Sequence, residues 1–381
     1  MFVYTLFSLL PFMAAFFWTV TIALYNINGW RKGFMPNLLL HSAVCTLLML
    51  GQAVYYNVPD SESGVFDIIS VVCRQAVYPV LFLFIKKITT SRGADSYDFL
   101  LLAPSFAAVV CAVVFRMTGS VHNGLLDWTS PVFLVVMLYV NVKSTIFIIR
   151  YNRQIRNFYS NTTRKTFDIM LWIMYLMLLS SVFSISMRLI GRDFFYGNQL
   201  WAVPSLLISM IIYLFFYEGI RIDFSAEDAA SDKLDVSQIL KFWKRNSSFI
   251  RREEIRKESI PVETNMELLE EMEKVIRERR MYRNPDLKIT DVVNAVASNR
   301  TYVSNAINHG LKMSFSDYIN RMRVEEAMSK LAEIEEGTPI RLVAEEVGFN
   351  NDATFYRHFR KVTGMTPADW MNKNKNKNIN Q

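Results

Sequence analysis

The residues best suited to chemistry lie in a short basic stretch near the C-terminus, residues 352–361. An arginine in the middle of a helix that enters the major groove can bond a guanine edge twice, and Arg357 has that position. Residues at the N-terminal end of such a helix also meet base edges, whereas basic side chains further along suit phosphate oxygens. The candidate DNA-contacting residues here are Asp352, Ala353, Thr354, Arg357, His358, Arg360 and Lys361.

A second polar stretch of the same kind lies upstream, in residues 300–308. Asn299 is placed to cap a helix there, and Asn305 on that helix suits the paired hydrogen bonds that identify adenine. For each such residue taken alone, ordinary solvated surface is the alternative interpretation. The candidate contacts in this stretch are Arg300, Thr301, Ser304, Asn305 and Asn308.

Two short helices around a tight turn are needed to present the first stretch. Residues 340–347 place their apolar side chains on one face, which predicts a helix. Gly348 suits the left-handed conformation that ends a helix, and Phe349 would fill the turn. Asn350 or Asn351 can cap the second helix. This layout is typical of a helix-turn-helix.

This region resembles the AraC/XylS transcriptional regulators. The family carries Gly-Phe, then phenylalanines six and ten residues after that Phe, then Gly-x-Thr-Pro. The matching residues of this chain are Gly348, Phe349, Phe355, Phe359, Gly364, Thr366 and Pro367.

The resemblance implies a second helix-turn-helix, which we place at residues 287–307, joined to the first by a long helix over residues 316–332. It also implies that Thr301, Ser304 and Asn305 occupy base-reading positions. The upstream unit departs from the family pattern at Val293 and Ala297, where alanine and glycine are usual. Arg323 matches a family position too, and its place in mid-helix favours an internal ion pair.

Composition divides the 381-residue chain into two halves of different character. Hydrophobic residues make up 51% of it, and residues 1–220 carry a net charge of +6 against +1 for the remainder. Seven apolar segments, each about long enough to cross a ~30 Å hydrocarbon layer, fill the first half. The segments are residues 2–25, 38–56, 65–85, 99–117, 131–149, 169–190 and 200–217.

The predicted fold is therefore all-α: a transmembrane helical bundle at residues 1–220, followed by a double helix-turn-helix domain at 266–371. The alternative is that six segments, and not seven, span the membrane. The first, third and fifth loops hold ten basic residues and the others three, which places the N-terminus outside and the C-terminal domain in the cytoplasm. We expect a bacterial inner membrane. The first segment lacks a basic flank and a cleavage site, so a signal peptide is disfavoured.

Three polar residues inside the apolar segments form a candidate ligand site: Arg74, Asn141 and Lys143. Ionisable groups at membrane depth usually face the bundle interior and mark function. Without acids at matching depth, these residues suggest an anionic or amphiphilic ligand. The alternatives are that Arg74 bonds helix carbonyls or Asp67, and that Lys143 reaches the inner surface.

Residues 221–265 form a charged juxtamembrane linker, in which residues 239–245 mix aromatic and basic side chains and suit either anionic headgroups or a solvated helix. Met266, Leu269, Met272 and Ile276 then recur on one helical face, which predicts packing on the first helix-turn-helix, with a dimer seam as the alternative. Residues 372–381 are of low complexity and expected to be disordered.

Several classes of function lack their signatures. Cysteines 45, 73 and 111 show no CxxC pair, and the four histidines show no metal-ligand spacing, so we expect no structural zinc, no cofactor and no enzyme activity. The expected partners are double-stranded DNA, the lipid bilayer and a second copy of the chain, with a membrane ligand or another membrane protein supplying the signal. The alternative is a membrane receptor or transporter whose helical tail binds protein.

Overall fold

A computed structural model describes residues 2–27, 33–57, 60–90, 95–118, 123–190, 202–222, 224–226, 228–231, 262–333 and 339–379. These residues are helical apart from turns and connections, and contain no strand, only an isolated bridge between Tyr159 and Lys288. The chain divides into two compact units. The first is Met1–Tyr151 with Phe167–Ala230, and the second is Asn152–Thr166 with Ser231–Gln381.

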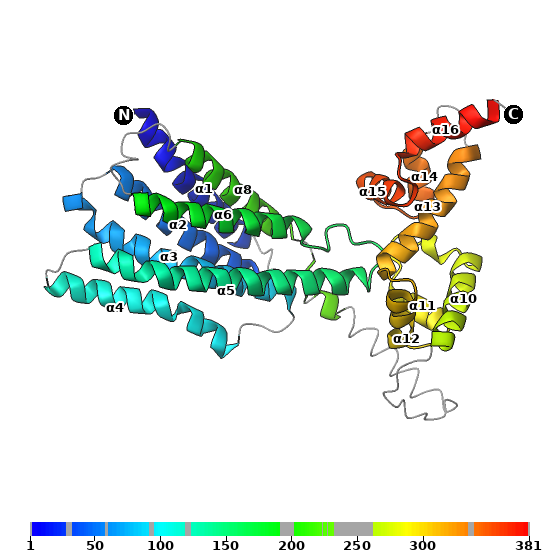
Figure 1. The fold of residues 1–381 in the computed structure, drawn as a ribbon, viewed down its shortest axis with the longest axis horizontal. Coiled ribbons are helices and arrows are strands. Elements are labelled where there is room, and N and C mark those ends of the chain that lie inside the picture. Colours follow the sequence, from blue (N-terminus) through cyan, green and yellow to red (C-terminus); the bar gives the residue numbers. More distant parts are fainter. Residues whose placement is uncertain are drawn as a thin grey trace, which may run out of the picture. The chain divides into compact units, whose positions relative to one another are not determined.

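The N-terminal unit is a bundle of long apolar helices (Figure 1). α1 packs on α2 and α8, α2 packs on α3, and α3 packs on α4. The elements are α1 (Phe2–Ile27), α2 (Met35–Asn57), α3 (Asp60–Thr89), η1 (Ser96–Leu102), α4 (Ala103–Thr118), α5 (Asn123–Arg156), α6 (Asp168–Ile190) and α8 (Ala202–Ile220).

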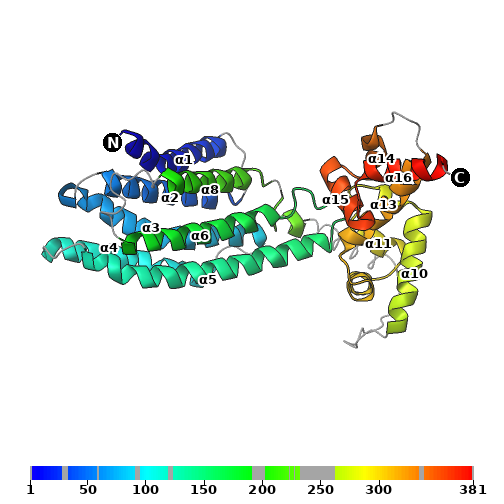
Figure 2. The same cartoon turned by 45° about the horizontal axis from the view of Figure 1, so that its top comes forward.

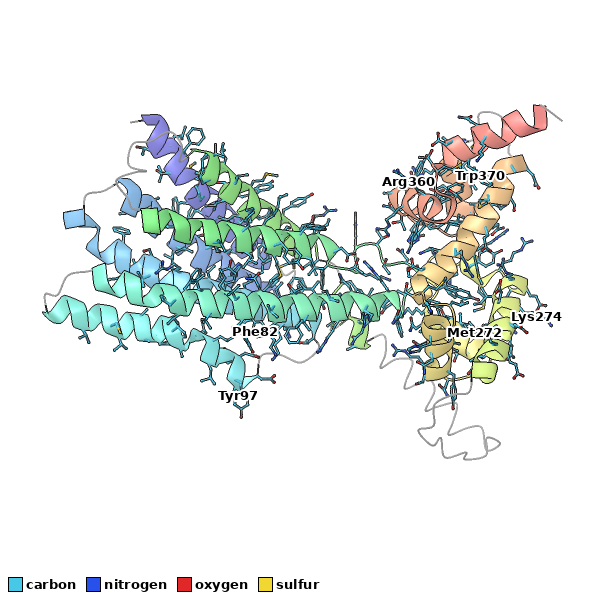
Figure 3. All side chains as sticks on the ribbon, in the orientation of Figure 1. Phe82, Tyr97, Met272, Lys274, Arg360 and Trp370 are labelled. Atoms are coloured by element: carbon cyan, nitrogen blue, oxygen red, sulfur yellow. The ribbon has the colours of Figure 1, made fainter. Side chains whose placement is uncertain are left out.

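Five of these helices are long and apolar enough to cross a membrane: α1, α2, α3, α5 and α8. The apolar parts of α4 and α6 within the described residues are shorter, so only five of the seven predicted segments meet this criterion there. α3 is the most enclosed, because 78% of its apolar window is buried. Figure 3 marks Phe82 on this buried helix, in contrast to the exposed Tyr97 on η1.

The C-terminal unit consists of short helices around one long helix (Figures 1 and 2). α13 confirms the predicted long helix over residues 316–332, with almost the same bounds. The elements are α10 (Val262–Glu278), η3 (Met281–Arg283), α11 (Ile289–Ala295), α12 (Arg300–Asn305), η4 (Ala306–Gly310), α13 (Phe315–Glu333), α14 (Ile340–Glu346), α15 (Asp352–Thr363) and α16 (Pro367–Ile379).

α13 serves both halves of this unit. Its Val324, Ala327 and Leu331 belong to one buried cluster with the apolar side chains of α14 and α15, including Phe355 and Phe359. α13 also contacts η3 and η4 of the other half. Such burial of apolar area on both sides of one helix couples the two halves into a single folding unit.

α10 packs on α11, α12 and η4, as its apolar pattern predicts. Leu269, Met272 and Ile276 are buried, whereas Lys274 on the other face is exposed (Figure 3). Met266 at the start of the same stripe is 54% exposed and takes no part in this packing.

The predictions for the linker, residues 221–265, and for the tail, residues 372–381, have different outcomes. Residues 232–261, and so most of the predicted linker with its 239–245 stretch, lie outside the described residues. The tail expected to be disordered is largely helical, because α16 continues through it to Ile379. At the start of α16 the hydroxyl of Thr366 donates to the carboxylate of Asp369 at 2.6 Å and accepts from the N–H of Asp369 at 3.2 Å, which caps the helix.

Candidate nucleic-acid interface

The downstream helix-turn-helix is formed by α14 and α15. α14 ends where Gly348 adopts φ +99°, and the N–H of Phe349 bonds the carbonyl of Ala344 at 2.9 Å across the turn. Phe349 is buried, as predicted, and packs edge-on against Phe355. Of the two possible caps, Asn351 is the one used: its side chain accepts from the N–H of Thr354 at 3.2 Å.

α15 exposes most of the residues that we selected for DNA contact. Asp352, Ala353 and Arg357 are exposed and Thr354 is half-buried. Arg360, marked on α15 in Figure 3, and Lys361 are also exposed; Lys361 pairs with Asp317 of α13 at 2.6 Å. One face of α15 thus offers polar and basic groups over almost its full length.

His358 is the exception, and its prediction as a phosphate contact is wrong. It is only 8% exposed, and its Nε2 lies 3.4 Å from Nδ2 of Asn320. Position 358 follows Phe355 by three residues, so it shares the inward face of the helix. Burial, and then the charge of Arg357, lower the pKa of His358 to about 4, so the imidazole is neutral at physiological pH.

The upstream helix-turn-helix is formed by α11 and α12. Val293 is buried, and Ala297, at the position of the family glycine, adopts φ +49°. The Asn299 side chain accepts from the N–H of Tyr302 at 3.0 Å, which confirms the predicted cap. α12 itself is shorter than the predicted 300–308, because a π-helical turn, η4, begins at Ala306.

The candidate residues of this unit are less uniformly accessible. Arg300 and Thr301 are exposed, whereas Ser304, Asn305 and Asn308 are half-buried. Asn308 donates to the hydroxyl of Ser304 at 3.0 Å, so this pair is held by its own hydrogen bond. The first turn of α12 is therefore its most open part.

Comparison with known proteins finds similarity over part of the chain. Residues 292–373 match the model of a helix-turn-helix domain family. An uncharacterised HTH-type transcriptional regulator, YtdP of Bacillus subtilis (strain 168), is 28% identical over 85 residues, which cover 22% of this chain and 11% of the relative. A protein of unknown function from Listeria innocua shares 25% identity, with a TM-score of 0.24, over 27% of this chain and 94% of its own.

The C-terminal unit contains an AraC-type helix-turn-helix domain. The match begins at Val292, inside α11, and ends after the Gly-x-Thr-Pro motif, so it takes in α12, α13, α14 and α15. The relative is much longer than the match, so the likeness concerns this domain alone.

A buried arginine on α13, Arg323, holds the AraC-type domain together. It is 1% exposed and donates to the carbonyls of Tyr282 at 2.6 Å and Asn284 at 2.7 Å, and to Oδ1 of Asn320 at 2.9 Å. Its guanidinium also lies 5.5 Å from the centre of the Phe349 ring. The predicted ion pair is wrong, since these oxygens replace a carboxylate.

Burial lowers the pKa of Arg323 to about 9, which leaves the guanidinium charged at neutral pH. Its planar fork can satisfy several oxygens at once, which explains why arginine serves here. The position was visible in the sequence through the family motif, but its partners were not.

Several basic residues elsewhere in the AraC-type domain are neutralised by ion pairs. Arg277 bonds Glu325 at 2.6 Å and Glu273 at 2.8 Å, and Arg283 pairs with Glu326. Among the described residues, no ion pair involves Arg300, Arg357 or Arg360. Arg300 on α12 and Arg357 and Arg360 on α15 thus carry positive charge that no carboxylate of the described residues neutralises, although the half-chain charge is only +1.

The three candidate residues for a membrane ligand site, Arg74, Asn141 and Lys143, do not all line one cavity. Arg74 is 5% exposed and lines a mostly apolar cavity of about 100 Å³ in the N-terminal unit, to which Gln52, Tyr78, Ser180 and Ser181 also contribute. Asn141 is buried and donates to the carbonyl of Met137 at 3.0 Å. Lys143 is exposed and lies outside the cavity lining, near the Tyr139 ring. The side chain of Asp67 is not among those described.

Proposed function

We propose that this chain is a membrane-bound, sequence-specific DNA-binding transcriptional regulator that couples a signal sensed in the membrane to gene expression. One observation carries the proposal: an AraC-type domain with two helix-turn-helix units shares a chain with five helices long and apolar enough to cross a membrane. The DNA-binding part needs the cytoplasm, and the distribution of basic residues among the loops favours the same side.

We infer that α12 and α15 are recognition helices, which contact DNA in successive major grooves. The exposed residues of α12 and α15 would meet base edges at their N-terminal ends and in the middle of α15. We also propose a homodimer in a bacterial inner membrane, because two linked DNA-binding domains raise effective concentration on paired sites. A helical tail that binds protein is the competing function.

Genome-wide DNA occupancy of the full-length protein tests this proposal. We expect discrete peaks for the wild type, lost in an Arg357→Ala, Asn305→Ala double variant. Lys274→Ala is the matched control, because Lys274 is an exposed base on α10, outside the two recognition helices. Peaks that survive in the double variant, or an absence of peaks at normal protein levels, would favour the protein-binding alternative.

We further propose that the cavity at Arg74 binds the carboxylate or phosphate headgroup of an amphiphile. A cation beside an apolar cavity of this size suits a small anionic group with an attached chain. Octanoate should raise the melting temperature of the full-length protein in nanodiscs, while octanol should not. Arg74→Gln should abolish the shift, and Lys143→Gln, outside the cavity, should retain it. An equal shift in both variants would refute the site.

A further inference from the structure

The segment Asn152–Thr166, which links α5 to α6, belongs to the C-terminal unit. Its backbone pairs with the residues that precede α11: the N–H of Ser160 bonds the carbonyl of Leu287 at 3.0 Å, and the N–H of Ile289 bonds that of Phe158 at 2.9 Å. Phe158, Tyr159 and Ser160 are all buried. This largely polar and basic loop, with Phe158 and Tyr159 in its middle, is thus docked on the AraC-type domain.

Ser160 enters the polar network around Arg323. Its carbonyl accepts from the hydroxyl of Ser316 at 2.8 Å and from Nδ2 of Asn320 at 3.3 Å. Its hydroxyl accepts from Arg323 at 3.2 Å and donates to the carbonyl of Pro285 at 3.3 Å. Because buried polar groups need partners, the network itself provides a reason for the segment to bind at this place.

The same segment reaches the first turn of both recognition helices. The guanidinium of Arg300, the first residue of α12, lies 4.9 Å from the centre of the Phe158 ring. The hydroxyl of Thr163 lies 3.0 Å from that of Thr354, the third residue of α15. These N-terminal turns are where helix-turn-helix proteins meet base edges. The docked segment therefore engages groups that DNA would use at both ends of the interface.

We propose that the segment 157–166 is an autoinhibitory strap that competes with DNA for the AraC-type domain. The inference rests on the DNA-binding function proposed above. Both ends of the strap continue into apolar helices, α5 and α6, so a rearrangement of these helices can withdraw it without any separate signalling domain. A signal that favours the undocked state shifts the population toward the DNA-binding form.

The strap also carries positive charge, so the alternative to inhibition is that the docked strap strengthens DNA binding. Arg164 is exposed, and Lys165 lies 4.2 Å from the centre of the Tyr159 ring. If these side chains served as additional phosphate contacts, docking would strengthen DNA binding. The engagement of Arg300 and Thr354 by the strap itself favours inhibition.

A reversible crosslink tests the strap directly. Cysteines at Thr163→Cys and Thr354→Cys would place their sulfur atoms near bonding distance, since the hydroxyl oxygens are 3.0 Å apart. The experiment uses the full-length chain in nanodiscs, with Cys111→Ser in every variant because Cys111 is exposed. The probe is the fragment most enriched in the occupancy map, with sheared genomic DNA as the non-specific reference. The two single-cysteine variants are the controls.

We expect the oxidised double variant to bind the fragment at least about tenfold more weakly than the same protein after reduction. The single-cysteine variants should not respond to reduction. Failure of the crosslink to form, or equal affinity of the oxidised and reduced states, would overturn the strap. Failure of the wild type to select the fragment over sheared DNA would instead refute the proposed function.

A variant that releases the strap from the AraC-type domain should have the opposite effect on DNA affinity. Phe158→Ser removes the buried ring, so it should raise affinity for the fragment about tenfold, while Phe158→Leu, which keeps an apolar side chain, should change it little. Weaker binding in Phe158→Ser, with the crosslink also strengthening binding, would show that the segment supports DNA contact and would overturn inhibition.

Discussion

The two helix-turn-helix units of the AraC-type domain build the same turn with different residues. In both, a backbone N–H reaches back five residues, from Ser298 to Val293 at 3.1 Å and from Phe349 to Ala344 at 2.9 Å. In both, the residue just before has a positive φ: +49° at Ala297 and +99° at Gly348. The two units therefore close the turn with the same backbone hydrogen bond, but they have different residues at the turn, Ala297 and Gly348.

The surroundings explain the difference. A Cβ built on Gly348 would lie 2.5 Å from the carbonyl oxygen of Arg283 and 2.8 Å from that of Tyr282. These backbone atoms are themselves fixed, because Arg323 bonds the Tyr282 carbonyl. Glycine at 348 thus satisfies both a backbone conformation and a close contact, whereas Ala297 has a φ near the left-handed region that single non-glycine residues can adopt at a cost.

Gly348→Ala should produce the largest effect. The added methyl would clash with backbone that cannot move aside easily, in a conformation already unfavourable for alanine, at a cost of about 3 kcal/mol or more. We expect hydrogen exchange in α14 and α15 of the full-length protein to accelerate strongly. Gly364→Ala is the matched control, because Gly364 also has a positive φ but nothing lies within 4 Å of its Cβ position. Equal acceleration in both variants would show that φ alone matters.

Because of His358, the stability of the downstream helix-turn-helix should depend on pH. Its folded pKa of about 4 lies below the unfolded value of 6.5, so below pH 6.5 the unfolded state binds more protons. Stability should therefore fall as the pH drops from 6.5 toward 4, with a loss of about 1 kcal/mol by pH 5.5.

Hydrogen exchange in α15 at pH 7.5 and 5.5, corrected for intrinsic rates, measures this loss. His358→Gln should remove the pH dependence, and His309→Gln, at an exposed histidine of η4 in the upstream unit, should retain it. A pH dependence that survives His358→Gln would mean that another group is responsible.

These differences show what the sequence could and could not predict. Gly348, Phe349, Phe355 and Phe359 form a local pattern whose spacing is sufficient to locate α14, α15 and their turn. The misplaced His358 was a local error, since a polar residue three positions after Phe355 shares its inward face. Apolar length gave the helices of the N-terminal unit in the same way, although only five reach the length needed to span a membrane within the described residues.

The docking of Ser160 and the partners of Arg323 could not be predicted, because both depend on groups far apart in sequence. Ser160 bonds residues more than 120 positions away, and the short segment around it shows no pattern that would identify these partners. No periodicity marks a segment that docks through two backbone amides, one hydroxyl and the adjacent rings of Phe158 and Tyr159. Long-range polar contacts of this kind appear only when the chain is folded.

Ala297→Gly should give the smallest effect, and one of opposite sign. Glycine adopts a positive φ without the steric cost that alanine bears, and that gain exceeds its extra chain entropy at such a position by about 0.5–1 kcal/mol. Exchange in α11 and α12 should slow slightly, while α15 stays unchanged. Ala295→Gly, within helix α11, is the matched control and should destabilise by a similar amount. Faster exchange in Ala297→Gly would mean that the Ala297 methyl makes contacts that outweigh its backbone strain, and the two turns would then differ in packing as well as in conformation.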